Sequence, residues 1–325
     1  EDGKTTVQIE LDYPAKTQGP VIEEMVRAKL VEAGIPADVK ISQNIIAHEV
    51  QRGVKVFDSV RNIIAVSSGK GGVGKSTVSA NLALALQQEG AKVGLLDADV
   101  YGPSQPTMLG ITDKPYSVDG KTLEPMIAHG LQVASVGVLI DPDQPMIWRG
   151  PLAVSALQQL LKQTNWKDLD YLIVDMPPGT GDIQLSLSQE VPLTGAVVVT
   201  TPQDIALMDA RKGLVMFEKV NVPILGIIEN MATHICSKCG HEEHIFGEGG
   251  AAKMAAQYGV DLLGELPLDI NIRLSMDKGE PIVISEPDSK VAQVYRDIAR
   301  KLAIAVSKKN KDYSAKMPSI KVSDT

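Results

Sequence analysis

A buried strand, a glycine-rich loop and a helix follow one another between residues 62 and 90, and this stretch limits the possible folds most. Its start, NIIAVSS, is apolar and rich in β-branched residues, which is typical of a buried strand. The next letters, GKGGVGKS, match G-x-x-x-x-G-K-[ST] in full, and an Ala- and Leu-rich helical segment follows. Because glycines let backbone N–H groups close around phosphate oxygens at a helix N-terminus, the sequence predicts a phosphate-binding loop. Its residues are Gly69, Lys70, Gly71, Gly72, Val73, Gly74, Lys75, Ser76 and Thr77.

The side chains of this loop predict how ATP and Mg²⁺ are held. Lys75 is placed to bridge the β- and γ-phosphates, and Ser76 is placed to bind Mg²⁺. A second loop, MPPGTGD, is stiff at its prolines and free at its glycines. We expect this loop to sense the γ-phosphate through the backbone N–H of Gly179.

Three carboxylates follow predicted buried strands. KVGLLD runs into Asp97 and Asp99, and YLIVD ends at Asp175. Since open α/β sheets bind ligands at the carboxyl ends of their strands, we expect these side chains near the phosphates. The interpretation is that Asp99 orients an attacking water and Asp97 acts through the Mg²⁺ shell. Asp175 is expected to accept a hydrogen bond from a Mg²⁺-bound water or from Ser76, and a helix cap is the alternative role for Asp97 and Asp99.

Three parts are expected along the 325 residues. Residues 1–57 predict a small α+β domain, and because the chain begins almost in a strand we expect that domain to lack its first elements. Residues 58–307 alternate apolar runs with helical segments, including a strand over 131–138 and a final helix over 288–307, which predicts an α/β domain with a mostly parallel, helix-covered sheet. Residues 308–325 are expected to be a flexible tail.

Composition excludes several classes of protein. The net charge of −8 and the pI near 5.2 argue against general nucleic-acid binding. No run approaches 18 uncharged apolar residues, and the polar start EDGKTTVQIELD has no signal-peptide core. The chain has two cysteines, too few for a disulfide scaffold. We therefore expect a cytoplasmic protein with neither membrane nor nucleic acid as partner.

The two cysteines form a second chemical centre in HICSKCGHEEH. Cys236 and Cys239 with His241 and His244 offer four zinc ligands, although one short loop would have to wrap the metal. A thioredoxin-like redox pair would need a helix start at the cysteines. The third possibility is half of a [4Fe–4S] site, because four thiolates could come from two chains of a symmetric dimer. A purely structural pair is the fourth.

The loop GKGGVGKS, with its second lysine, resembles the deviant phosphate-binding loop of the MinD, ParA, ArsA and nitrogenase iron-protein ATPases. That resemblance implies that Lys70 reaches across a dimer to the partner's nucleotide and assists catalysis. It also implies that Asn230 holds adenine, with Pro267 and Asp269 completing the base pocket. Arg149, before another predicted helix, is expected to meet phosphate, a partner subunit or a structural carboxylate.

Further motifs narrow the resemblance to one family. GKGGVGKST, LLDADVYGPS, WRGP, VDMPPGTGD, IIENM and the C-x-x-C segment through HIFGEGG occur in this order. Together they resemble the Mrp/ApbC family of iron–sulfur cluster carrier ATPases over about residues 59–307. The resemblance implies a homodimeric ATPase that holds a transferable [4Fe–4S] cluster through Cys236 and Cys239 and passes it to apo-proteins. The rivals are a MinD/ParA-like positioning switch and a zinc-stabilised NTPase scaffold.

Overall fold

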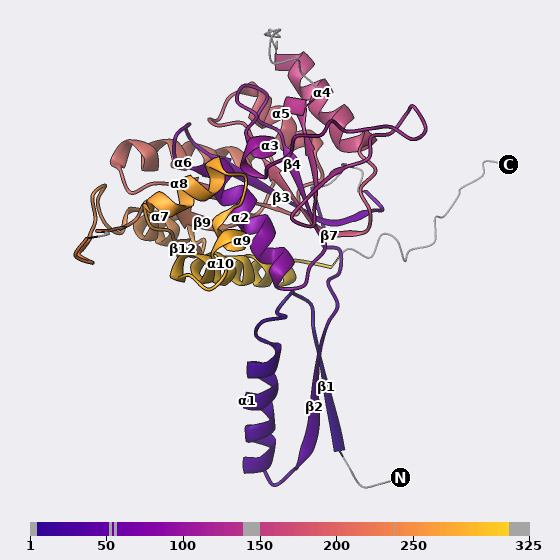
Figure 1. Ribbon diagram of the computed structural model, residues 1–325, viewed down its shortest axis with the longest axis vertical. Helices are drawn as coiled ribbons and strands as arrows, with labels where there is room; N and C mark the ends of the chain where they lie inside the picture. Colours follow the sequence, from indigo (N-terminus) through magenta and orange to yellow (C-terminus); the bar gives the residue numbers. More distant parts are fainter. Residues whose placement is uncertain (1–4, 52–53, 55–56, 139–149, 237, 312–325) are drawn as a thin grey trace, which may run out of the picture.

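An eight-stranded sheet forms the centre of the computed structural model, which describes residues 5–51, 54, 57–138, 150–236 and 238–311. The strand order is β12-β9-β8-β3-β7-β4-β6-β5, and every neighbouring pair is parallel except β5 with β6. The predicted α/β class with a mostly parallel sheet is therefore confirmed (Figure 1). The strands are β3 (Val60–Ser68), β4 (Val93–Asp97), β5 (Met126–Ala128), β6 (Leu131–Ser135), β7 (Leu169–Asp175), β8 (Gly195–Thr200), β9 (Ile224–Glu229) and β12 (Leu262–Glu265).

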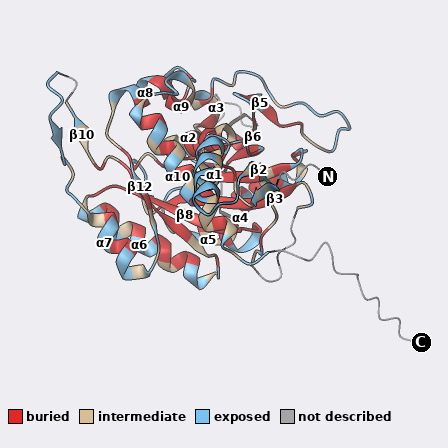
Figure 2. Cartoon of the chain, turned by 90° about the horizontal axis from the view of Figure 1, so that it is seen from below, coloured by how far each residue is buried: buried red, intermediate tan, exposed pale blue. Residues whose placement is uncertain are grey.

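Helices cover both faces of this sheet, and alternate residues of β3 show why. Ile64 and Val66 belong to the apolar cluster on one face, whereas Ile63 and Ala65 belong to the cluster on the other. Figure 2 shows the buried strands between helices that are exposed on their outer sides. The first face carries α2 (Lys75–Gln88), α8 (Ile270–Asp277), α9 (Ile282–Ser285) and α10 (Lys290–Ser307). The second carries α4 (Gly150–Gln163), α5 (Asp182–Glu190), α6 (Asp204–Lys219) and α7 (Gly250–Tyr258).

A small N-terminal unit projects from the end of the molecule (Figure 1). It consists of β1 (Thr5–Leu11), α1 (Gly19–Glu32) and β2 (Ala37–Gln43), and the two strands pair in parallel. Its anchor is Glu89, just after the C-terminus of α2. The Glu89 carboxylate accepts hydrogen bonds from the Thr17 N–H (3.0 Å) and hydroxyl (2.7 Å) and pairs with Arg300 (2.5 Å).

Several boundaries differ from those expected from the sequence. The strand expected over 131–138 ends at Ser135, where its hydroxyl donates to Asp97, and a 3₁₀ turn, η1 (Val136–Val138), follows. The final helix begins at Lys290 because Ser289 caps it by accepting from the Ala292 N–H (3.1 Å). Strand β5 and the short hairpin β10 (His234–Ile235) with β11 (Glu242–Glu243) were not expected.

Some expectations fall where little or nothing is described. Arg149, residues 52, 53, 55 and 56 before the expected domain boundary, and the tail from residue 312 lie outside the described residues. At the start of the expected tail, the Asn310 carbonyl accepts a hydrogen bond from the Glu49 N–H. Lys311 forms an isolated antiparallel β-bridge with His48. In the part of the chain that the structure describes, no helix is both long and apolar enough to cross a membrane.

Candidate functional site

The loop between β3 and α2 has a conformation that depends on its glycines. Gly72 and Gly74 have φ values of 83° and 81°, in the left-handed region that favours glycine. Gly69 instead lies against α6, where an added Cβ would come within 2.1 Å of the backbone carbon of Asp209. The close approach of strand, loop and helix therefore requires glycine at position 69.

This loop borders a cavity of about 210 Å³ at the carboxyl ends of the strands. The cavity brings together eight predicted site residues, namely Lys70, Gly71, Gly72, Gly74, Lys75, Ser76, Thr77 and Asp99. Val73 is buried behind the loop. The full lining is Ser68, Lys70, Gly71, Gly72, Gly74, Lys75, Ser76, Thr77, Asp99, Ser104, Met108 and Pro178.

Lys75 is directed to Asp175 in this structure. Its Nζ lies 2.5 Å from Asp175 Oδ1, and both side chains are almost fully buried. The same carboxylate accepts from Ser79 Oγ (2.9 Å) and from Gln105 Nε2 (2.9 Å). A phosphate bound in the cavity would therefore compete with Asp175 for the Lys75 ammonium.

Asp97 lies opposite Asp175 in the β4–β7 register and is fully buried. It accepts from the backbone N–H groups of Ser104 and Gln105, both at 3.1 Å, and from the Ser135 hydroxyl at 3.0 Å. Burial, reinforced by the charge of Asp175, raises the pKa of Asp97 to about 7. Asp97 thus holds the loop that leads into α3 (Gln105–Met108), whose N-cap residue is Ser104, and its action through the Mg²⁺ shell stays a prediction.

Asp99 differs from Asp97 because it lines the phosphate cavity. Burial raises the pKa of Asp99, and the nearby Lys75 ammonium opposes that rise. The hydroxyl of Ser76 and the carboxylates of Asp97, Asp99 and Asp175 are hard oxygen donors, which Mg²⁺ prefers, but the three carboxylates do not gather closely enough to hold the ion by themselves. Two of these carboxylates are fully buried beside each other, so a cation is also electrostatically favoured there. The residues therefore fit a Mg²⁺ ion whose remaining ligands are nucleotide phosphates and water.

Gly179 and Asn230 have partners in the phosphate loop or next to it. The Gly179 N–H donates to the Ser68 carbonyl (2.9 Å), so it must exchange this partner before it can meet a phosphate. Asn230 Nδ2 donates to the Val73 carbonyl (2.9 Å). The predicted contact of Asn230 with adenine stays a prediction, but its amide holds the phosphate loop.

Pro267 and Asp269 line a different cavity, of about 600 Å³, beside β10 and the start of α10. Asp269 Oδ1 accepts from the Asn271 N–H (2.7 Å) and so caps α8. Asn230 is not among the residues that line this cavity. The expected base pocket is therefore not assembled around one space in this conformation.

Sequence reasoning missed two residues of the site. Ser79 lies one helical turn after Lys75, a spacing that could have suggested a contact with the same carboxylate. Gln105 follows the motif LLDADVYGPS directly, but no pattern distinguished it from an ordinary helix start. Its contacts with Ser76 and Asp175 depend on the tertiary fold.

The two cysteines lie in the turn of the β10–β11 hairpin. The Cys236 N–H donates to the His241 carbonyl (2.9 Å), and the Gly240 N–H donates to the Cys236 carbonyl (2.8 Å). Cys236 is half-buried and Cys239 is exposed, and both are free thiols. Backbone hydrogen bonds from Lys238 and Cys239 lower the pKa of the Cys236 thiol, which favours the thiolate that metals bind.

His241 lies in this turn and contributes its backbone carbonyl, whereas His244 follows β11. His244 Nδ1 contacts the Ala232 carbonyl at 3.0 Å, and its Nε2 lies 3.8 Å from Glu248. Within the described ranges, no three His, Cys, Asp or Glu side chains gather closely enough to hold a metal ion. The arrangement expected for a one-chain zinc site is therefore not found there.

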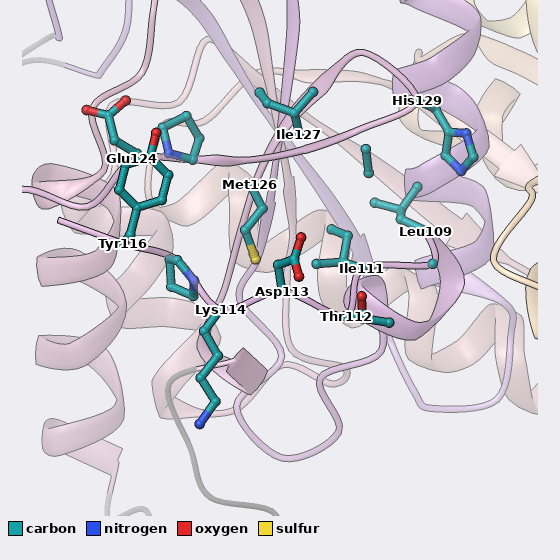
Figure 3. Close-up of a pocket in the computed structure, with 14 residues that line it drawn as sticks. Leu109, Ile111, Thr112, Asp113, Lys114, Tyr116, Glu124, Met126, Ile127 and His129 are labelled. Carbon is teal, nitrogen blue, oxygen red and sulfur yellow. The ribbon is translucent and has the colours of Figure 1, made fainter. Parts of the chain in front are cut away.

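Another cavity, of about 790 Å³, lies elsewhere, between the segment 109–116 and strand β5. Figure 3 shows Asp113, Lys114, Tyr116 and His129 around it, from the two sides of this space. None of the predicted site residues lines it. We therefore treat it as separate from the phosphate cavity.

Comparison with known proteins gives consistent matches. The family model ParA, described as NUBPL iron-transfer P-loop NTPase, matches residues 59–303. The chain is 55% identical over 303 residues to an iron-sulfur cluster carrier protein of Salmonella typhimurium, covering 92% of this chain and 82% of that protein. It is 51% identical over 247 residues to the iron-sulfur cluster transfer protein NUBPL of Mus musculus, covering 75% and 77%.

Solved structures show the same fold. A nucleotide-binding protein of Archaeoglobus fulgidus in complex with ADP has a TM-score of 0.64 and 37% identity, covering 73% of this chain and 93% of that one. The cell division ATPase MinD of Pyrococcus furiosus has a TM-score of 0.58 and 25% identity, covering 74% and 98%. The segment matched by the family model contains the whole lining of the phosphate cavity and both cysteines.

Proposed function

The chain belongs to the ParA family, as an iron-transfer P-loop NTPase of the NUBPL type, and from this premise we propose that it is an ATP-dependent iron–sulfur cluster carrier. It binds a [4Fe–4S] cluster between two copies of itself and transfers the cluster to apo-proteins. Cys236 and Cys239 of each copy are the ligands. The cluster is cargo, and ATP binding and hydrolysis control its loading or release.

The observation that carries this proposal is the position of the cysteine pair. The only two cysteines of the chain lie together in one hairpin turn, as free thiols, with Cys239 exposed. A [4Fe–4S] cluster takes four thiolates, so two chains related by a two-fold axis supply the complete set. A MinD-like or ParA-like switch uses the same phosphate cavity but gives this pair no role.

Features around the phosphate loop support a homodimer. Lys70 lines the cavity, from which it can reach the nucleotide of a facing subunit. Ile205 and Met208 of α6 are 68% and 58% exposed, and the neighbouring Asp209 backbone abuts Gly69. Clustered exposed apolar side chains mark protein interfaces. The proposed dimer covers this face and places Lys70 at the partner's phosphates, where a cation stabilises the transition state.

In the proposed hydrolysis of ATP, the predicted site residues have distinct roles. Lys75 leaves Asp175 and binds the β- and γ-phosphates, while the backbone of the loop holds the remaining oxygens. Asp99, which faces the cavity, orients the attacking water. Ser76, with Asp97 and Asp175 nearby, would hold Mg²⁺, which would neutralise phosphate charge when bound. Gly179 exchanges the Ser68 carbonyl for the γ-phosphate, and Asn230 and the segment with Pro267 and Asp269 close around the base.

Four single variants test the cluster site. Cys236→Ala or Cys239→Ala leaves two thiolates per dimer, so a stable cubane should not form. His241→Ala and His244→Ala are the controls, and they should retain the cluster. The measurement is anaerobic reconstitution followed by absorbance in the thiolate-to-iron charge-transfer region and by iron, sulfide and zinc analysis. Nucleotide binding should survive in all four variants, because neither cysteine nor histidine lines the phosphate cavity. Stoichiometric zinc that depends on both histidines, with no iron, would contradict the proposal.

A further inference from the structure

Gln105, the first residue of α3, joins three segments of the phosphate site. Its backbone N–H donates to Asp97 Oδ2 (3.1 Å). Its side-chain Nε2 donates to the Ser76 carbonyl (3.0 Å) and to Asp175 Oδ2 (2.9 Å). The residue is fully buried and does not line the cavity, so it cannot touch a phosphate directly in this conformation.

The orientation of this amide is fixed by its surroundings. Both atoms near Nε2 are acceptors, so turning the amide over would place Oε1 against the Ser76 carbonyl and the Asp175 carboxylate. In the present orientation Oε1 is buried and has no hydrogen-bond partner among the described residues. A buried acceptor without a partner is unfavourable, so the contacts of Nε2 outweigh that penalty.

The need for a second donor follows from the movement of Lys75. Asp175 is fully buried beside Asp97, and Lys75 is its only charged donor among the contacts that the structure describes. When Lys75 turns to the phosphates, Asp175 loses that donor. A buried carboxylate is stable only if hydrogen bonds remain. Ser79 then still donates a hydrogen bond to Asp175 Oδ1, and Gln105 still donates one to Asp175 Oδ2.

We propose that Gln105 is a positioning residue for nucleotide hydrolysis, whose neutral amide keeps Asp175 fixed relative to Ser76 when Lys75 moves to the phosphates. The same amide binds the Ser76 backbone, so the residue whose hydroxyl is proposed to bind Mg²⁺ and the Asp175 carboxylate are connected through one side chain. The inference rests on the proposed ATPase activity and adds a residue that acts through Asp175 and Ser76.

The test is the variant Gln105→Leu, which keeps the size of the side chain and removes the amide. Affinity for ADP is measured by calorimetry with Mg²⁺ and with EDTA, alongside kcat and KM for ATP. Loss of a residue that orients metal ligands lowers metal affinity about 10- to 100-fold, so the gain in ADP affinity on adding Mg²⁺ should fall by at least about tenfold. Affinity in EDTA should change by less than about threefold, and kcat should fall more than KM rises.

Gln184→Leu is the matched control. Gln184 is also buried, donates through Nε2 to the Ser67 hydroxyl, and has an Oε1 without a partner in the described part of the chain. The Gln184→Leu substitution should lower the melting temperature to a similar degree and leave the gain in ADP affinity on adding Mg²⁺ unchanged. If Gln105→Leu does not fold, Gln105→Met provides a longer, flexible side chain that also lacks the donor.

The outcomes separate this role from the proposed function. A lower melting temperature in Gln105→Leu or Gln105→Met with an unchanged Mg²⁺-dependent gain would show a merely structural residue and overturn the inference. A loss of that gain in Gln184→Leu as well would overturn it too, because the effect would not depend on contact with Asp175. Wild-type protein whose nucleotide affinity ignores Mg²⁺ would instead overturn the proposed ATPase.

Discussion

Two carboxylates, Asp97 and Asp175, lie side by side at the ends of β4 and β7 without access to water. Lys75 forms an ion pair with Asp175, whereas Asp97 has only neutral hydrogen-bond donors among its described contacts. Burial, reinforced by the charge of Asp175, raises the pKa of Asp97 to about 7. At the scale of single residues, Asp97 therefore takes up a proton at a higher pH than an ordinary aspartate.

The Asp97 carboxyl makes stability depend on pH in a defined direction. Its pKa is raised from 3.8 to about 7 on folding, so the native state binds a proton that the unfolded state has released between these values. The contribution of Asp97 to the free energy of unfolding is thus fully present below pH 3.8 and is lost as pH rises through about 7. Asp97→Asn should remove this part of the pH dependence.

Thermal melting of nucleotide-free protein measures the effect. Between about pH 5 and pH 8, wild-type protein should lose more stability than Asp97→Asn, because only the wild type must release the proton. Glu286→Gln, a substitution at an exposed carboxylate outside the phosphate cavity, should follow the wild type. Parallel melting curves for wild type and Asp97→Asn would show that Asp97 is not the group responsible.

At the scale of elements, the contact between the phosphate loop and α6 depends on a missing side chain. An added Cβ at Gly69 would meet backbone atoms of Asp209 and Ala210, which cannot move aside as a flexible side chain can. Gly69→Ala should therefore shift α6 or the loop and lower the free energy of unfolding by about 1–3 kcal/mol. Denaturant unfolding without nucleotide is the measurement.

Gly71 provides the control within the same loop. An added Cβ there meets nothing within 4 Å. The free energy of unfolding of Gly71→Ala should therefore lie within about 0.5 kcal/mol of the wild-type value. Equal stability of Gly69→Ala and wild type would mean that α6 lies farther from Gly69 than it does in this structure.

Elements with a strong local signal were predictable from the sequence. The apolar run before Gly69 and the run ending at Asp175 indicated buried parallel strands, and both lie in the sheet centre. The family resemblance predicted from the ordered motifs is confirmed as well. These features were accessible because strand hydrophobicity and the glycines of the loop are local properties of the chain.

Other features depend on contacts between distant segments. Strand β5 has three residues, and only its pairing with β6 makes it a strand. The direction of Lys75, from the loop to Asp175 100 positions later, could not be read from the motif, which indicated phosphate. Asp269 was expected at the base, but the nearby Asn271 N–H gives it a capping role in this conformation. How these charged side chains lie relative to one another therefore could not be predicted without the tertiary structure.

At the scale of the whole molecule, the account predicts that two chains share each ATPase site. Lys70→Ala should bind ATP but hydrolyse it on the order of a hundredfold more slowly, because a cation supplied in trans is missing. Asp99→Asn should also bind ATP without turnover, because it lacks the carboxylate that orients water. Mixing the two variants should restore activity, since one site of each heterodimer has a native Asp99 and receives Lys70 from its partner.

Equal mixing gives about half heterodimers with one complete site each, so roughly a quarter of wild-type turnover is expected after subunit exchange. Phosphate release after exchange is the measurement, and each variant mixed with itself is the control. Activity that stays at the level of the separate variants, in dimers shown to have exchanged, would assign Lys70 a role within its own subunit.

The most direct test of the central claim counts clusters per dimer. Native mass spectrometry of anaerobically reconstituted wild-type protein should give a species of two chains with four iron and four sulfide, about one cluster per dimer. The same preparation of Cys239→Ala should give chains without this added mass. A wild-type monomer that carries its own metal, or a cluster retained in Cys239→Ala, would contradict a carrier that holds its cargo between two subunits.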